Sequence, residues 1–167
     1  MILNFRREVY GIGDRYYIYD ENWERKYYVK GSSVLFSQKF EICDLSKKKV
    51  LVTIKNEPKS LVKKKHYVYV GNEKVATLTK EFPSLTTKYI IEGLNWEKRG
   101  VMRTSYEMLE NGKRVFSMDT EGTDWGITPV LRIEDGVDEL TALGVAMVIT
   151  YVNAVNQDDD ENNTEYL

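Results

Sequence analysis

Cysteine and histidine are almost absent from this chain of 167 residues, which has one of each, Cys43 and His66. A single cysteine excludes an intramolecular disulfide. The two residues are also too few for a Cys/His zinc site or for a triad that uses a second histidine. The other residues form no catalytic constellation, so we expect a protein that is not an enzyme, with no catalytic residues, no metal and no cofactor.

Long apolar segments are scarce too. Residues Met1 to Arg7 lack the apolar run of a signal peptide, so we expect a reduced, cytoplasmic protein. The run from Leu143 to Ile149 lies inside residues 140–155, and 16 residues span roughly 24 Å as a helix, less than the ~30 Å core of a bilayer. A helix that is apolar on every side must be surrounded by protein or lipid. We therefore predict a helix buried in its own domain, with insertion into a membrane as the less favoured alternative.

Tyrosine, in contrast, is abundant, with 12 copies, and this residue favours β-strands. The hydrophobic fraction of 42% and the charged fraction of 30% are those of a globular chain rather than a disordered one. The length suits a single domain.

An internal repeat organises most of the chain. Its pattern is an aromatic residue, any residue, an apolar residue, any residue, and then Asp, Gly or Glu. The five copies begin at Tyr16, Phe40, Tyr67, Tyr89 and Tyr106. Each is followed by a polar, turn-prone stretch and then by a second apolar run, which together predict a β-hairpin. Five hairpins give about ten strands, and the flanking segments 4–10 and 130–133 raise the number to about twelve.

The strand period of two assigns the residues of each repeat to two faces. The positions without charges are predicted to face inward: Tyr16, Ile18, Phe40, Ile42, Tyr67, Tyr69, Tyr89, Ile91, Tyr106 and Met108. The alternate positions are predicted to face outward: Tyr17, Tyr19, Glu41, Cys43, Val68, Val70, Ile90, Glu92, Glu107 and Leu109. Apolar hairpins need a filling for their inner face, and the C-terminal helix supplies it.

The sequence therefore predicts a mainly β fold, a closed antiparallel barrel of about twelve strands wrapped around a C-terminal hydrophobic helix. We expect the helix at about residues 138–156, and carboxylates in residues 134–139 suit its positive N-terminal end. The barrel domain is predicted to comprise residues 1–156. Residues 157–167 are predicted to be an acidic, disordered tail.

This pattern resembles the LURP-one-related family. The resemblance rests on residues 13–20, 40–44 and 75–80 and on the apolar segment 140–155. That family shares its fold with Tubby proteins and phospholipid scramblases, so the resemblance implies a twelve-stranded antiparallel barrel closed around a central hydrophobic helix. Tubby domains bind phosphoinositide headgroups through basic residues of the barrel surface, but none of those residues is assigned to a position of this chain.

Charge is segregated along the sequence. Residues 46–90 contain 11 basic and 3 acidic side chains, a net charge of +8, whereas residues 157–167 contain 5 acidic side chains and no basic one. Two lysine clusters within the basic segment are candidate sites for a phosphate or an anionic headgroup: Lys47, Lys48, Lys49, Lys63, Lys64 and Lys65. The alternative is that both are solvated turns or strand ends. A strand over residues 49–55 would span about 20 Å, which would place the clusters toward opposite ends of the barrel.

The favoured function is a non-enzymatic binding module for anionic lipid headgroups or another phosphate ligand, peripheral to a membrane. The alternative is a protein-interaction scaffold that uses the apolar outward positions Val68, Val70, Ile90 and Leu109. The expected partners are an anionic membrane surface or another protein, and no nucleic acid.

Overall fold

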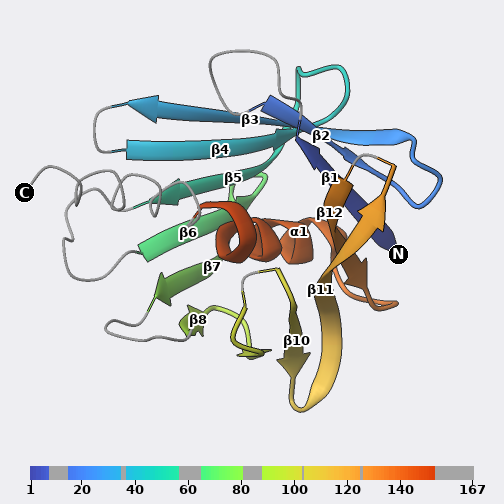
Figure 1. The fold of residues 1–167 in the computed structure, drawn as a ribbon. Coiled ribbons are helices and arrows are strands. Elements are labelled where there is room, and N and C mark those ends of the chain that lie inside the picture. Colours follow the sequence, from blue (N-terminus) through green and yellow to red (C-terminus); the bar gives the residue numbers. More distant parts are fainter. Residues whose placement is uncertain are drawn as a thin grey trace, which may run out of the picture.

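A computed structural model describes residues 1–7, 15–34, 37–56, 65–80, 88–102, 104–124 and 126–152. The described residues form twelve strands and one helical segment (Figure 1). The strands are β1 (Ile2–Arg7), β2 (Arg15–Tyr19), β3 (Arg25–Val34), β4 (Ser37–Cys43), β5 (Val50–Asn56), β6 (Lys65–Val70), β7 (Glu73–Lys80), β8 (Tyr89–Glu92), β9 (Trp96–Arg99), β10 (Tyr106–Glu110), β11 (Lys113–Thr123) and β12 (Gly126–Ile133). The helical segment consists of α1 (Glu139–Met147) and the π-helical η1 (Val148–Val152). The predicted tail 157–167 and the last predicted helical residues, 153–156, lie outside the described residues.

All twelve strands belong to one antiparallel sheet with the order β8-β7-β6-β5-β4-β3-β2-β1-β12-β11-β10-β9. Strands β8 and β9, at the two ends of this order, contact each other without forming a ladder. The predicted twelve-stranded antiparallel barrel is thus confirmed, and it is nearly closed. No helix formed by the described residues is long and apolar enough to cross a membrane.

The barrel has two distinct ends because neighbouring strands are antiparallel. We call one the turn end, where the even-numbered strands finish and short connections follow: 20–24, 44–49, 71–72, 93–95, 111–112 and 134–138. The other is the loop end, where the even-numbered strands begin. Lys65, the first residue of β6, therefore lies at the loop end, together with Lys80, the last residue of β7.

Helix α1 enters the barrel at the turn end. The Asp138 side chain caps it by accepting a hydrogen bond from the Thr141 backbone N–H at 2.8 Å. Glu139 in the first turn accepts a hydrogen bond from the Tyr27 hydroxyl at 2.9 Å and lies 2.7 Å from the Lys26 ammonium. A carboxylate at this position interacts favourably with the positive end of the helix dipole, as the sequence predicted.

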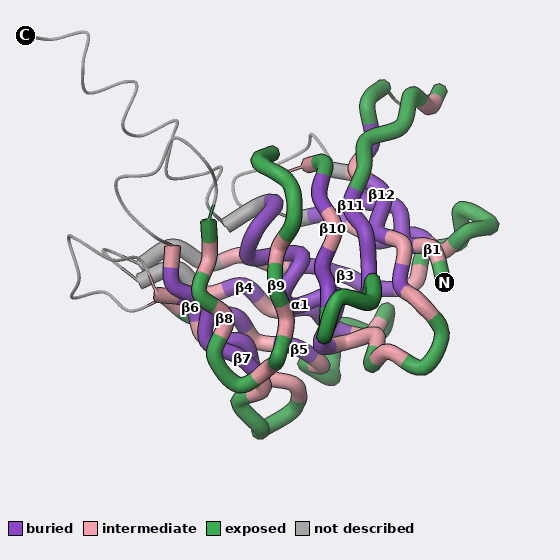
Figure 2. Tube along the Cα trace, turned by 90° about the horizontal axis from the view of Figure 1, so that it is seen from below, coloured by how far each residue is buried: buried purple, intermediate pink, exposed green. Residues whose placement is uncertain are grey.

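The helix is surrounded by strands, which explains why it is apolar on every side (Figure 2). Residues 141–150 are all buried. Gly144 lies where the helix approaches β5 and β6 most closely, because a Cβ atom there would be 2.6 Å from Val68 Cγ1 and 3.1 Å from Val52 Cγ1. Close packing of helix against strand is therefore the reason for a glycine in the middle of this helix.

The inward residues were predicted correctly in four of the five repeats, where they are buried or pack against the core cluster. The exception is β6, in which His66 and Val68 are buried while Tyr67 and Tyr69 are only half-buried. The predicted inward position of Tyr67 and Tyr69 is wrong. The outward position of Val68 and Val70 is wrong too, because Val68 belongs to the core cluster and Val70 packs against it. The physical reason is the approach of Gly144, which places Val68 directly against the helix.

A β-bulge occurs in four of the hairpins and was not predicted. The ladder shifts register after Ile18, Ile42, Val68 and Met108. The partner strands carry one additional residue at these places: Lys26, Leu51, Val75 and Val115. Bulges increase the local twist of a sheet and help it to close into a barrel. Three of the four additional residues also contribute apolar surface to the core at the turn end.

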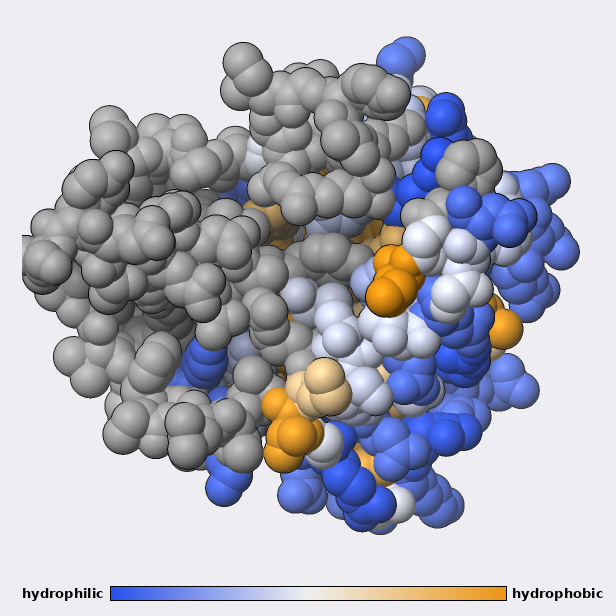
Figure 3. Space-filling model, in the orientation of Figure 1, coloured by the Kyte–Doolittle hydropathy of each residue, from blue (hydrophilic) through white to orange (hydrophobic). Residues whose placement is uncertain are grey.

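Figure 3 shows one face of the molecule. The described residues on this face are mainly hydrophilic, and the hydrophobic ones form small, separate patches. Among the outward positions named for an apolar interaction surface, Leu109 is buried and Val70 packs against the core. Only Ile90 of that group is well exposed, at 48%. The predicted apolar surface is therefore wrong for Val68 and Leu109, because their side chains are covered by the protein itself.

Candidate functional site

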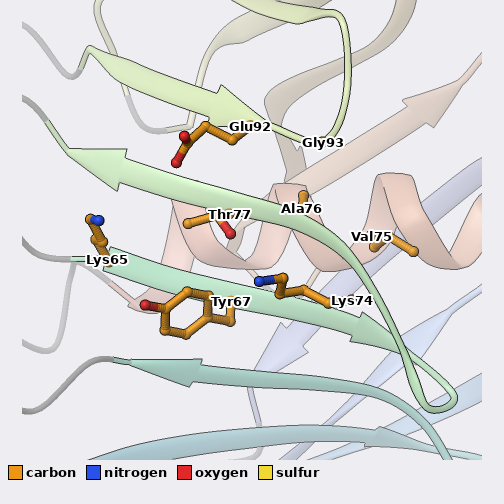
Figure 4. Close-up of a pocket in the computed structure, with 8 residues that line it drawn as sticks. All are labelled: Lys65, Tyr67, Lys74, Val75, Ala76, Thr77, Glu92 and Gly93. Atoms are coloured by element: carbon orange, nitrogen blue, oxygen red, sulfur yellow. The ribbon is translucent and has the colours of Figure 1, made fainter.

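A hollow of about 360 Å³ lies on the outer face of β6, β7 and β8 (Figure 4). We call it the lysine–tyrosine hollow. Its lining residues are Lys65, Tyr67, Lys74, Val75, Ala76, Thr77, Glu92 and Gly93. They come from three adjacent strands and the turn after β8, so the barrel itself fixes their relative positions.

The register of the sheet explains how these side chains meet. Lys55 pairs with Tyr67, Tyr67 with Thr77, and Thr77 with Glu92, so one row of outward side chains crosses four strands. Thr77 is the smallest member of this row, and it leaves space between the larger side chains of Tyr67 and Glu92. The next pair along β6 and β7, Lys65 and Thr79, extends the row of outward polar groups toward the loop end.

The bulge in β7 forms the other end of the hollow. Val75 is the additional residue of this bulge, and the turn after β8 packs directly against its backbone. A Cβ atom on Gly93 would lie 2.7 Å from the Val75 carbonyl oxygen, and Gly93 has a φ of +93°. Both observations require glycine at this position, since L side chains rarely adopt a positive φ.

Lysines and tyrosines alternate around the hollow. The Lys74 ammonium lies 5.4 Å from the centroid of the Tyr67 ring, and the Lys55 ammonium lies 5.3 Å from the centroid of the Tyr69 ring. These are cation–π distances, and both lysines are exposed to solvent. Lys65 adds a third cation from the start of β6 (Figure 4).

Glu92 is the one carboxylate among the residues that line the hollow. It is exposed and lies across Thr77 from Tyr67. Two lysines and one glutamate leave the lining with a net positive charge. The hollow therefore combines cationic donors, hydroxyl groups and one strong acceptor, which suits an anionic ligand that also carries hydroxyls.

The first predicted lysine cluster, Lys47, Lys48 and Lys49, lies in the turn between β4 and β5 at the turn end. Lys47 has a φ of +62°, and its ammonium lies 4.2 Å from the centroid of the Tyr28 ring. The backbone N–H groups of Lys48 and Lys49 each donate to Asp44 Oδ1 at 3.2 Å. This cluster is consequently a capped turn whose first ammonium is already engaged with an aromatic ring.

The two predicted clusters do not form one patch. Lys49 precedes β5 at the turn end, whereas Lys65 begins β6 at the loop end, beside the last residues of β5. The seven residues of β5 separate them by about 20 Å along the barrel, as the sequence predicted. Lys63 and Lys64 lie outside the described residues, so Lys65 alone represents the second cluster in the hollow.

The lone cysteine and histidine are both buried. Cys43 is a free thiol with no exposed surface, and burial raises its pKa, which disfavours the reactive thiolate. His66 is 1% exposed and faces the barrel interior on β6. The described residues contain no group of three or more His, Cys, Asp or Glu side chains that could hold a metal ion.

Comparison with known proteins places this barrel in a family. The family model described as LURP-one-related matches residues 1–151. The chain belongs to the LURP-one-related family. This membership agrees with the resemblance found in the sequence, and it extends over almost all of the described residues.

One sequence relative and one solved structure are similar to this chain. The chain is 27% identical over 161 residues to the uncharacterized protein YxjI of Bacillus subtilis (strain 168), an alignment that covers 96% of this chain and 97% of that protein. The fold is similar to the X-ray structure of a protein from Arabidopsis thaliana, with a TM-score of 0.60, 16% identity and 91% of each chain covered. At that identity the likeness concerns the fold alone. Neither name states a ligand or an activity. The geometry and charge of the lysine–tyrosine hollow are therefore the basis for a functional proposal.

Sequence reasoning found Lys65 but missed the other residues that line the hollow. Lys74 stands alone between Glu73 and Val75, so no charge run marks it. Tyr67 was predicted to face inward because the first and third positions of every repeat were assigned to the same face. Lys65 shares one face of β6 with Tyr67 and Tyr69, but His66 places a polar residue on the other face, so the strand alone does not show which face is outward.

Proposed function

We propose that this LURP-one-related protein is a non-enzymatic binding module for a phosphate-bearing ligand, either a free phosphate ester or a lipid headgroup. The observation that carries the proposal is that Lys65 and Lys74, from neighbouring strands, both line one hollow that also contains Tyr67 and Thr77. Within this proposal the protein is cytoplasmic and peripheral to the membrane.

The chemistry of the hollow supports a phosphate. A phosphate monoester carries a charge of about −1.5 to −2 near pH 7 and accepts several hydrogen bonds. Lysine ammonium groups bind phosphates as mobile point charges, and bonds between charged partners are stronger than neutral ones. The volume of about 360 Å³ is near the lower end of the range for small-molecule sites, roughly 300–1,000 Å³. It suits a headgroup or a sugar phosphate better than a larger cofactor.

Glu92 narrows the class of ligand. Its carboxylate would repel a bare inorganic anion but accept hydrogen bonds from ligand hydroxyl groups. A phosphate ester of a polyol presents both groups at once, with the phosphate toward the lysines and the hydroxyls toward Glu92. The geometry therefore favours polyol phosphates over inorganic phosphate or simple alkyl phosphates.

The distribution of charge along the chain supports a binding site within the basic segment 46–90. The lysines of the hollow belong to the segment 46–90, whose net charge is +8, while the protein as a whole has a net charge of −2. Attraction to an anionic surface must therefore come from this segment. Each lysine close to such a surface contributes about 1 kcal/mol, and the contribution is screened beyond a Debye length of about 8–10 Å.

The test is sedimentation of the full chain with neutral and anionic vesicles across a salt series. Removing two lysines that face the surface costs about 2 kcal/mol, so Lys65→Glu with Lys74→Glu should weaken binding by roughly 30-fold or more at low salt. The matched control is Lys48→Glu with Lys49→Glu, which makes the same change of charge at the opposite end of the barrel and should have a much smaller effect. Binding should nearly disappear at about 0.5 M salt, where the Debye length is below 5 Å.

Soluble ligands distinguish the two sources of phosphate. A headgroup-like polyol phosphate should compete with anionic vesicles if the lipid headgroup is the ligand. Binding of the soluble ester by calorimetry, without vesicle binding, would identify a free phosphate ester instead. No binding to either at low salt would contradict the proposal and leave a protein-interaction scaffold as the better hypothesis.

A further inference from the structure

The position at which the chain leaves the barrel bears on how the lysine–tyrosine hollow is used. Helix α1 begins at the turn end, where Glu139 contacts Tyr27. At its other end, Met147 Sδ lies 3.7 Å from the Tyr16 hydroxyl, and the Thr150 and Tyr106 hydroxyl oxygens are 3.5 Å apart. Tyr16 and Tyr106 stand at the beginnings of β2 and β10, so the helical segment finishes at the loop end.

The same strands separate the helix from the hollow. Gly144 of α1 packs against Val52 and Val68 on the inner face of β5 and β6, and the hollow lies on the outer face of β6, β7 and β8. The described chain therefore leaves the barrel interior at the loop end, the end at which Lys65 begins β6. Six residues lead from Val152 to Asp158. Fully extended, six residues reach up to about 20 Å.

The C-terminal segment and the hollow carry opposite charges. Residues 157–167 carry five carboxylates and no basic group: Asp158, Asp159, Asp160, Glu161 and Glu165. The hollow offers Lys65 and Lys74, with Lys55 beside it. In contrast, the exposed part of β11 at the loop end carries Asp119 and Glu121, which would repel this segment.

We propose that residues 158–161 dock in the lysine–tyrosine hollow of their own chain and act as a built-in competitor for external anions. The tether keeps the segment at an effective concentration in about the millimolar range, so weak contacts suffice for substantial occupancy. An external ligand then binds only the open fraction of molecules. If that fraction is about one tenth, the apparent Kd is raised about tenfold. The docking does not depend on the proposed function, whereas the competition rests on it.

Carbodiimide cross-linking tests the docking without any ligand, because the reagent joins a carboxylate directly to a lysine amine in contact with it. The full chain is treated at low micromolar concentration and analysed by mass spectrometry. We expect cross-links from residues 158–161 to Lys65 or Lys74 that disappear at about 0.5 M salt, where exposed ion pairs are screened. Cross-links to Lys48 or Lys49 instead would overturn the proposal. So would cross-links that join light and heavy isotope-labelled molecules, since the occupant would then be a second copy.

Vesicle binding tests the competition. Changing Asp158, Asp159 and Asp160 to Asn and Glu161 to Gln should tighten binding to anionic vesicles about tenfold at low salt. The control neutralises four exposed carboxylates at the turn end by amide substitution: Glu21, Glu24, Glu110 and Asp135. It changes net charge equally and should alter binding much less. Equal tightening by both variants would show a general charge effect and contradict the competition.

The two proposals fail in different ways. Cross-links to Lys65 or Lys74 without vesicle or phosphate-ester binding by any variant would leave the docking intact and refute the binding function. Salt-sensitive binding that depends on Lys65 and Lys74, without these cross-links and without an effect of tail neutralisation, would refute the docking and leave the binding function intact.

Discussion

Gly144 provides a sharp test of the packing between the central helix and the barrel. On helix propensity alone, Gly144→Ala should stabilise the protein by about 1 kcal/mol. The structure predicts the opposite sign. The new methyl group would lie 2.6 Å from Val68 Cγ1, closer than real Cβ contacts allow, and Val68 is a β-branched residue with little rotamer freedom. Overpacking of this kind typically costs about 1–3 kcal/mol, which leaves a net loss of roughly 1 kcal/mol.

A double-mutant cycle with Val68→Ala isolates the contact. Val68→Ala alone should cost about 2 kcal/mol, because it removes buried methyl groups. In that background the nearest remaining Val68 atom, Cβ, is 4.0 Å from the new methyl, an ordinary contact. Val52 Cγ1, 3.1 Å from the new methyl, then remains the one tight neighbour and must move by a few tenths of an ångström. Gly144→Ala should therefore be close to neutral in that background, which gives a coupling free energy of about 1 kcal/mol between the two positions.

The assay is urea unfolding followed by circular dichroism, with thermal unfolding as a second measure. A loss of 1 kcal/mol lowers the Tm of a domain of this size by about 2–4 °C. Gly122→Ala is the matched control, because Gly122 has no neighbour within 4 Å of a built Cβ atom. A Gly144→Ala variant that is more stable than wild type by the full propensity gain would refute the close approach of helix and strand.

Three further predictions concern other parts of the barrel. Val148→Asp should prevent cooperative folding in thermal unfolding, because Val148 has no exposed surface and an unpaired buried charge is among the most destabilising changes. Burial and the hydrogen bond to Glu139 raise the pKa of Tyr27 well above its usual value near 10. The unfolded chain therefore loses this proton first as the pH rises, and stability should fall above about pH 10 in pH-dependent urea unfolding, with a smaller slope for Tyr27→Phe. Gly93→Ala should cost several times more stability in urea unfolding than Gly112→Ala, since both have positive φ values but only Gly93 meets backbone, at 2.7 Å.

The hairpins and the central helix could be predicted from sequence because their signals are local. Each repeat places an aromatic and an apolar residue two positions apart, and a turn follows, so the period of two is readable within five residues. The run 143–149 is apolar without a break, which only a surrounded helix tolerates. Closure into one barrel follows from the number of strands and the need to fill their inner face.

Which residues of β6 face inward could not be predicted, because this strand has no clearly polar face. Tyr67, Val68, Tyr69 and Val70 alternate two residue types that are both acceptable in a core, so nothing in the strand decides which pair faces inward. The decision comes from Gly144 of the helix, far away in the sequence. The bulges were missed for a similar reason, since each depends on a partner strand.

The candidate site was only partly predictable for the same physical reason. Charge density in the sequence identified Lys65, and the length of β5 correctly separated it from Lys47 and its neighbours. Lys74 and Glu92 meet Lys65 only through the register of three strands, and register is a property of the assembled sheet.

The most direct test of the proposed binding site is an amide chemical-shift titration of the isotope-labelled protein with a soluble polyol phosphate at low salt. We expect the largest changes at Lys65, Tyr67, Lys74 and Thr77, with little change in the turn 44–49. Changes concentrated in the turn 44–49, or the same changes in a Lys65→Glu, Lys74→Glu variant, would contradict the proposed site.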